Sequence, residues 1–144
     1  MNKDLANKVV DKMLAGDKFS RWLGIEKVLS EPGHCILKMK IREEMVNGFG
    51  IAHGGICFSF ADSALAFASN AYGRLSVALE CSISFPVAVN VGDVLTCEAR
   101  ELSLTNKTGT YLIEIKNQKG ENVAFFKGTV YRTSKEWFPE EINK

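Results

Sequence analysis

Five residues near the middle of the chain could together act on a carbonyl group: Asn47, His53, Gly54, Gly55 and Asp62. Two successive glycines at a helix start leave backbone N–H groups unpaired and uncovered by side chains, which suits a carbonyl oxygen gaining negative charge. The Asp62 carboxylate could attack that carbonyl as a nucleophile or activate water as a general base. The group therefore predicts a site that activates an acyl carbonyl.

Asp62 is the only formally charged side chain between Ile51 and Tyr72. An unpaired carboxylate in apolar surroundings is costly unless something solvates it or uses it, and this favours a functional role. Simpler interpretations stay open for each residue alone. The glycines could only permit tight packing, His53 could be a satisfied core histidine, and His53 with Cys57 could share a metal, although no second ligand pair follows.

The spacing of the glycines and the aspartate constrains the site. Asp62 follows Gly54 by eight residues, which is roughly 12 Å along a helix at about 1.5 Å per residue. One acyl carbonyl cannot touch both groups of a single chain. If both act on it, the aspartate comes from a second subunit packed antiparallel, so the chemistry predicts a dimer.

The element that must position these groups is a long helix over residues 51–71, with the glycine pair at its start and Gly73 just past its end. It is apolar nearly all round, as expected of a helix enclosed on every side. It is also long enough to suggest a membrane span, but Asp62 at its centre argues for burial inside a protein. A shorter amphipathic helix is expected at about residues 3–16.

The remaining segments alternate with the period of a strand. Strands are expected near residues 25–29 and 34–43, separated by the turn Glu31-Pro32-Gly33. Four more are expected near residues 79–85, 93–102, 111–116 and 123–132. Short connections imply an antiparallel sheet, and one six-stranded sheet curled around the central helix satisfies both patterns. The predicted fold class is α+β, in one domain over residues 1–144.

Composition excludes several classes of function. A net charge of +1 provides no basic field for nucleic acid or anionic membrane. The N-terminal residues lack the apolar core of a signal peptide, and the four cysteines contain no CxxC pair and fall among apolar neighbours. Cysteines of this kind are usually buried thiols in a reducing compartment, so a cytoplasmic location is expected.

The segment NGFGIAHGGICFSFADSALAFASN resembles the N-G-x(4)-H-G-G-x(6)-D motif of hotdog-fold acyl-CoA thioesterases. The chain is most similar to the phenylacetic-acid degradation (PaaI-type) branch. The likeness extends through DKFSRWLGI, the SISF strand and NKTGTYLIEIKNQKGENVAFFKGTVYR, over about residues 10–133. The resemblance implies a hotdog fold, in which a sheet wraps a central helix and two chains join their sheets.

The resemblance also implies a role for each residue of the motif. Asp62 would be the general base or nucleophile, and the N–H of Gly54, helped by Gly55, would polarise the thioester carbonyl held by the partner chain. His53 and Asn47 would orient the site and the attacking water or the carbonyl. No metal or organic cofactor is implied, since coenzyme A is part of the substrate. The implied partners are acyl-CoA and a second copy, with a tetramer as an open alternative.

Two departures from the family pattern affect the binding groups. Some relatives carry a Ser or Thr where this chain has Ala78, and Ser76, Ser82 or Ser84 could substitute for it. The segment after the SISF strand often carries a basic pair, whereas this chain reads Phe-Pro-Val-Ala at 85–88. Candidates for contacting the coenzyme A phosphates are Lys107, Arg74 and Arg132, each of which could equally be a solvated surface charge.

The leading functional hypothesis is a thioesterase for acyl-CoA, with an aromatic acyl group such as phenylacetyl. Side chains near Asp62 in sequence could line an acyl pocket or belong to the core: Phe58, Phe60, Leu65 and Phe67. A hotdog hydratase or dehydratase is an alternative, although such enzymes pair a histidine with a carboxylate in a different motif. A non-catalytic acyl-CoA-binding protein is another, but the presence of Asp62 argues against it.

Overall fold

The computed structural model describes residues 3–142, which form one antiparallel sheet, one long helix and several short helices. Along the chain the elements are α1 (Lys3–Gly16), α2 (Lys18–Leu23), β1 (Glu26–Glu31), β2 (His34–Lys40), a 3₁₀ turn (Glu43–Met45), α3 (Gly54–Asn70), β3 (Arg74–Ser84), β4 (Val94–Leu104), β5 (Thr108–Lys116), β6 (Asn122–Glu136) and α4 (Pro139–Ile142).

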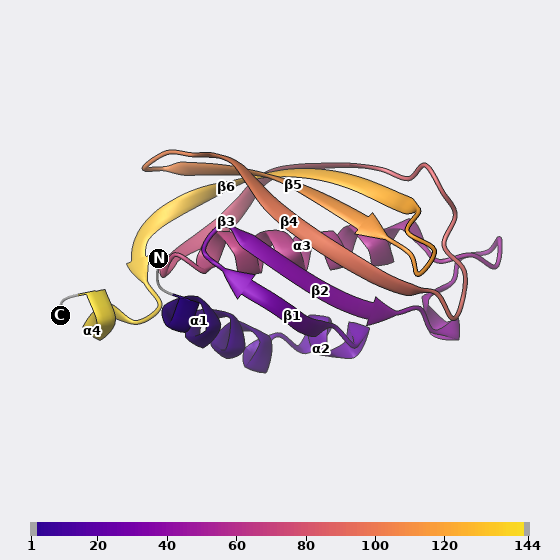
Figure 1. Ribbon diagram of the computed structural model, residues 1–144, viewed down its shortest axis with the longest axis horizontal. Coiled ribbons are helices and arrows are strands. Elements are labelled where there is room, and N and C mark those ends of the chain that lie inside the picture. Colours follow the sequence, from indigo (N-terminus) through magenta and orange to yellow (C-terminus); the bar gives the residue numbers. More distant parts are fainter. Residues whose placement is uncertain (1–2, 143–144) are drawn as a thin grey trace.

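The sheet has the strand order β1-β2-β4-β5-β6-β3, and every pair of neighbours is antiparallel. It curves around α3, while α1 and α2 lie beside β1 at the lower edge (Figure 1). This is the hotdog arrangement, so the expected fold class and the expected six strands are confirmed. The sheet is open at two edges, β1 and β3, and these edges are not equivalent because α1 packs against β1 only.

Alternate residues of the strands face α3, as their sequence period predicts. Completely buried inward positions recur along β4 and β5, namely Leu95, Cys97, Ala99, Tyr111, Ile113 and Ile115. The inward side of β2 is equally buried, with Cys35 and Leu37 inaccessible to solvent. The hydrophobic core is therefore the layer between the sheet and α3.

α3 is mostly buried, but one stripe of it stays open within the single chain. Gly55 is exposed, and Phe58, Ser59, Asp62 and Ala66 are only half-buried. The expectation of a helix enclosed on every side is therefore wrong for the single chain, because no element among residues 3–142 fully covers this stripe. Nor is any helix in that part of the chain long and apolar enough to cross a membrane.

The short helix α2 is an element that periodicity does not predict. Its N-cap is Asp17, whose carboxylate accepts the Ser20 N–H at 2.9 Å, and it ends at Gly24 in the left-handed conformation (φ 79°). The buried Ser20 hydroxyl also contacts the Ser63 hydroxyl at 2.7 Å. This hydrogen bond fixes α2 against the side of α3, one residue after Asp62.

Strand β3 combines a free edge with exposed apolar side chains. Val77 and Leu79 are 48% and 59% exposed, and the pairing with β6 skips one residue between Ala78 and Glu80. Leu79 is thus the extra residue of a β-bulge, which breaks the expected alternation in this strand. A strand with one free edge and an apolar surface is a ready site for pairing with another chain.

Candidate active site

The N-terminus of α3 presents one unused backbone donor. The His53 ring caps the helix, since its Nδ1 accepts the Gly55 N–H at 2.8 Å, and the His53 carbonyl accepts the Ile56 N–H at 2.9 Å. The Gly54 N–H has no hydrogen-bond partner among residues 3–142. Because the helix dipole adds positive potential there, Gly54 is the donor best placed for a carbonyl oxygen. The expected help from Gly55 requires the His53 cap to release.

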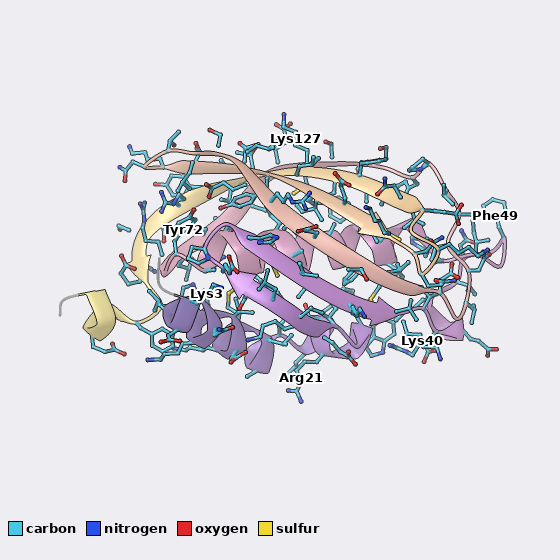
Figure 2. All side chains as sticks on the ribbon, in the orientation of Figure 1. Lys3, Arg21, Lys40, Phe49, Tyr72 and Lys127 are labelled. Carbon is cyan, nitrogen blue, oxygen red and sulfur yellow. The ribbon has the colours of Figure 1, made fainter. Side chains whose placement is uncertain are left out.

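Asn47 supplies a second polar group at this end of α3. Its Oδ1 accepts the N–H groups of Phe49 at 2.9 Å and Ile51 at 3.3 Å, which shapes the turn before the helix. Phe49 lies at the tip of that turn and projects into solvent, as Figure 2 shows. The Asn47 Nδ2 makes no hydrogen bond within residues 3–142, so its N–H groups remain available to a carbonyl or a water.

Asn47 and Gly54 line a common cavity of about 300 Å³. Its other walls are mostly apolar, with Cys57 on α3 and the Phe85 ring beyond the end of β3. A Cβ placed on Gly54 would lie 3.2 Å from Cζ of Phe85. Because glycine has no Cβ, a ligand in the cavity can reach the Gly54 N–H. The arrangement can hold a carbonyl oxygen in surroundings that contain little competing polarity.

Asp62 lies in a separate cavity of about 200 Å³ between α3 and β3. The lining includes Leu65, Val77 and Ala78, and the carboxylate makes no hydrogen bond or ion pair within residues 3–142. Burial raises the pKa of Asp62 above its ordinary value, and the negative charge of Asp17 raises that pKa further. A carboxylate with a raised pKa is a better general base than an ordinary one.

The structure thus brings Asn47, His53 and Gly54 together and leaves Asp62 apart from them. The two cavities share no lining residue. This separation agrees with the eight-residue spacing along α3: within one chain, the free N–H groups of Asn47 and Gly54 and the carboxylate of Asp62 lie in different cavities.

Of the serines considered as substitutes at Ala78, only Ser76 lines the Asp62 cavity, together with Ser69 of α3. Ser82 and Ser84 line a different hollow, with Phe125 and Lys127. The Ser76 hydroxyl contacts the Arg74 carbonyl at 3.3 Å rather than Asp62. Within one chain, no serine hydroxyl among the described residues is hydrogen-bonded to the aspartate.

Comparison with known proteins identifies the family. A sequence profile of the thioesterase superfamily matches residues 49–124. Acyl-coenzyme A thioesterase PaaI of Escherichia coli is 38% identical over 120 residues, which are 83% of this chain and 86% of that protein. The chain belongs to the thioesterase superfamily. Its expected class, a thioester hydrolase, is confirmed by this membership.

Solved structures agree with the identification. The structure of Escherichia coli PaaI, from the phenylacetic acid degradation operon, has a TM-score of 0.91 and 34% identity, and covers 93% of this chain and 97% of that one. A Streptococcus mutans protein bound to acetyl CoA has a TM-score of 0.76 and 28% identity, over 78% of this chain and 90% of that one. Both support a hotdog thioesterase fold over most of the chain.

In this thioesterase-superfamily chain, two of the expected phosphate contacts already have backbone partners. The Arg74 guanidinium donates to the carbonyls of Asn106 at 2.8 Å and Thr133 at 3.0 Å. Arg132 donates to the Thr105 carbonyl at 2.6 Å. Lys107 is exposed in the same region, and these three residues lie beyond the C-terminal end of α3. The assignment of all three to coenzyme A stays a prediction.

The aromatic residues near Asp62 in sequence mostly belong to the core of the thioesterase fold. Phe60, Leu65 and Phe67 are almost completely buried. Phe58 is half-buried and packs edge-on against Phe126, with ring centroids 5.2 Å apart. Of the four residues considered for an acyl pocket, Leu65 contributes to the Asp62 cavity, whereas Phe60 and Phe67 belong to the buried hydrophobic core.

Sequence periodicity misses two aromatic residues that adjoin the site. Phe19 and Trp22 of α2 line a hollow together with His53 and Gly55, on the side of α3 away from Phe85. Six residues are too few to show a helical period. The available signal is the pair of helix boundaries, a capping Asp17 and a terminating Gly24.

Proposed function

We propose that the protein is an acyl-CoA thioesterase that hydrolyses aromatic, phenylacetyl-like thioesters to a free acid and coenzyme A. The observation that carries the proposal is a pair of unused groups, the N–H of Gly54 and the unpaired carboxylate of Asp62. Each lines a cavity, and neither has a hydrogen-bond partner within residues 3–142. The identity to PaaI of Escherichia coli supports the substrate class.

In the proposed reaction, the Gly54 N–H and an N–H of Asn47 bind the thioester oxygen and stabilise the negative charge that develops on it. Asp62 of a second copy removes a proton from water as the water oxygen bonds to the carbonyl carbon. The C–S bond then breaks, and the proton passes to the departing thiolate, which leaves as coenzyme A. The overall balance is one thioester plus one water giving one acid and one thiol.

Direct attack by Asp62 has the same balance but passes through a mixed anhydride. Single-turnover hydrolysis in water labelled with heavy oxygen separates the two routes. General-base catalysis puts the label into the released acid in the first turnover. Attack by Asp62 leaves the first acid with one aspartate oxygen when water opens the anhydride at the aspartyl carbon.

The proposed unit is a homodimer joined through β3. The free edge of β3 and the open stripe of α3 lie on either side of the Asp62 cavity, so a second copy would cover both. A two-fold axis would bring each Asp62 to the other chain's Gly54, because the two groups are eight residues apart on antiparallel helices. The dimer would thereby complete two sites that one chain leaves in halves.

The proposed reaction requires no metal and no organic cofactor. Water is the co-substrate, the fold supplies the electrostatic stabilisation, and coenzyme A arrives as part of the substrate. All four cysteines are free thiols, which suits a reducing compartment, and we therefore place the reaction in the cytoplasm.

Thiol release from a panel of acyl-CoA esters tests the proposal. Phenylacetyl, benzoyl, short-chain and long-chain esters are compared with dithiobis-nitrobenzoate as the thiol probe, for the native protein and Asp62→Asn. We expect phenylacetyl-CoA to be hydrolysed best and Asp62→Asn to lose about 10²–10⁴-fold in kcat. Asp11→Asn, an exposed aspartate paired with Lys27, is the matched control and should keep full activity.

Binding without turnover of any ester would contradict the enzyme proposal and favour an acyl-CoA-binding protein. Turnover that survives Asp62→Asn would show that another group is the base.

A further inference from the structure

A second hollow, of about 420 Å³, lies across the α3 N-terminus from the Asn47 cavity. Phe19 and Trp22 of α2 line it, together with His53 and with Gly55 and Ser59 of α3. His53 and Gly55 are the two neighbours of Gly54. A carbonyl bound at the Gly54 N–H would therefore have the Asn47 cavity on one side and this hollow on the other.

The aromatic wall is exposed but firmly held. Phe19 and Trp22 are 53% and 48% exposed, and their rings stack with centroids 6.1 Å apart at 24°. Arg42 donates to the Trp22 carbonyl at 2.7 Å and to the Leu23 carbonyl at 3.1 Å, and its guanidinium lies 5.0 Å from the Trp22 ring centroid. The wall is thus preorganised for a ligand, so little side-chain freedom would be lost on binding.

The charges around the hollow favour an uncharged occupant. Glu44 is the only ionised side chain among its lining residues, and the nearby Arg42 is engaged by two carbonyls and by Glu44 itself at 3.5 Å. The nucleotide end of coenzyme A carries several negative charges, and the lining residues of the hollow include no Lys or Arg to bind them. An aromatic acyl group carries no charge and would stack on the exposed rings.

We propose that Phe19 and Trp22 form the aromatic wall of the acyl-group subsite and determine the preference for aromatic acyl-CoA. This inference rests on the proposed thioesterase function. The thioester would then straddle the α3 N-terminus, with its acyl arm in the hollow beside α2 and its pantetheine arm in the cavity beside Phe85. The Ser20–Ser63 hydrogen bond would hold the acyl wall in register with the helix that carries both catalytic groups.

Acyl selectivity tests the proposal in the full-length protein. Phe19→Leu and Trp22→Leu keep an apolar surface but remove the stacking rings. We expect the ratio of kcat/KM for phenylacetyl-CoA to kcat/KM for acetyl-CoA to fall about tenfold in each. Phe125→Leu, on the outer face of the sheet, is the matched control and should keep the native ratio. An unchanged ratio in both test variants would overturn the proposal.

Tryptophan emission supplies a second measurement that does not need turnover. In Asp62→Asn, phenylacetyl-CoA should change the emission, and the added substitution Trp22→Phe should abolish this change. The other tryptophan, Trp137, serves as an internal reference because it lies at the far end of α3, bonded to Asn70. Free coenzyme A should have little effect on the emission.

The two proposals fail in different ways. A native protein that hydrolyses no ester contradicts the thioesterase function, while the emission experiment still reports on the subsite. An equal response to free coenzyme A would assign the hollow to the coenzyme arm and overturn the acyl assignment. Dissociation of the dimer in Trp22→Leu with native selectivity would show that a second copy covers the wall, which also overturns it.

Discussion

At the residue scale, the proposed role of Asp62 as a base conflicts with the stability of the fold. It carries a carboxylate in a largely apolar cavity, without a hydrogen bond or ion pair within residues 3–142. Burial first, and the charge of Asp17 second, raise its pKa in the folded chain. The folded state therefore binds this proton more tightly than the unfolded state does. The resulting stabilisation is present below the unfolded pKa, about 3.9, and is lost as pH rises through the folded pKa.

Asp62→Asn should consequently unfold at a higher temperature than the native protein at neutral pH, because the amide has no charge to desolvate. The difference should shrink as pH falls below the ordinary pKa of an aspartate, where the native side chain is also neutral. Thermal unfolding of both proteins across this pH range measures the effect. A less stable Asp62→Asn at neutral pH would show that the carboxylate has a stabilising partner.

Gly54 permits a direct removal of the proposed donor. It is the first residue of α3, where proline is tolerated, and His53 before it is extended (φ −62°, ψ 137°), as the residue preceding a proline must be. Gly54→Pro should therefore fold and lose about 10²–10³-fold in kcat, the usual effect of deleting one oxyanion donor. Gly54→Ala adds the same Cβ near Phe85 but keeps the N–H, so it should lose much less. Equal losses of kcat in the two variants would show that crowding against Phe85, and not the missing N–H, lowers the activity.

Residue types and spacing predict which residues lie near the α3 N-terminus. They do not predict which of the polar groups there are already hydrogen-bonded. In the structure Asn47, His53 and Gly54 lie together at the N-terminal end of α3, as the motif predicts. That His53 Nδ1 occupies the Gly55 N–H depends on a ring orientation that spacing does not specify. Likewise, the engagement of Arg74 by carbonyls is visible only once the ends of β4 and β6 are folded together.

At the element scale, periodicity predicts every strand and both long helices, because each spans enough residues to show its period. It fails where an element is short or irregular. α2 has six residues and is marked only by its caps, and the bulge at Leu79 breaks the alternation of β3. The last strand also runs to Glu136, beyond the expected end at 132.

Asn70 joins three elements at the C-terminal end of α3. Its Nδ2 donates to the carbonyls of Ala66 at 2.8 Å and Ser76 at 3.1 Å, and its Oδ1 accepts from the Ser76 N–H and the Trp137 Nε1, both at 2.8 Å. All four hydrogen bonds of this buried amide are made.

Asn70→Asp should destabilise the fold by about 2–4 kcal/mol, because a carboxylate oxygen would face two carbonyls. Urea unfolding measures the change, and the exposed Asn90→Asp is the matched control, expected within about 0.5 kcal/mol of the native protein. A small effect at Asn70 would mean that the end of α3 is held without this amide.

At the scale of the whole molecule, the single chain leaves open the β3 edge, a stripe of α3 and the two cavities that hold Gly54 and Asp62. Two lysines in place of Val77 and Leu79 on β3 should prevent strand pairing by like-charge repulsion across a two-fold axis. We expect this variant to be monomeric by light scattering and inactive. Val28→Lys on the opposite edge, at an equally exposed position, should remain dimeric. An active monomer would contradict a shared site.

The most direct test of the shared site mixes Gly54→Pro and Asp62→Asn subunits after co-expression. Each hybrid dimer would contain one site with both substitutions and one with an intact Gly54 from one chain and an intact Asp62 from the other. Random pairing at equal amounts should restore about a quarter of native thioesterase activity. Activity no higher than that of the separate variants would show that Gly54 and Asp62 act within one chain, contrary to the site proposed above.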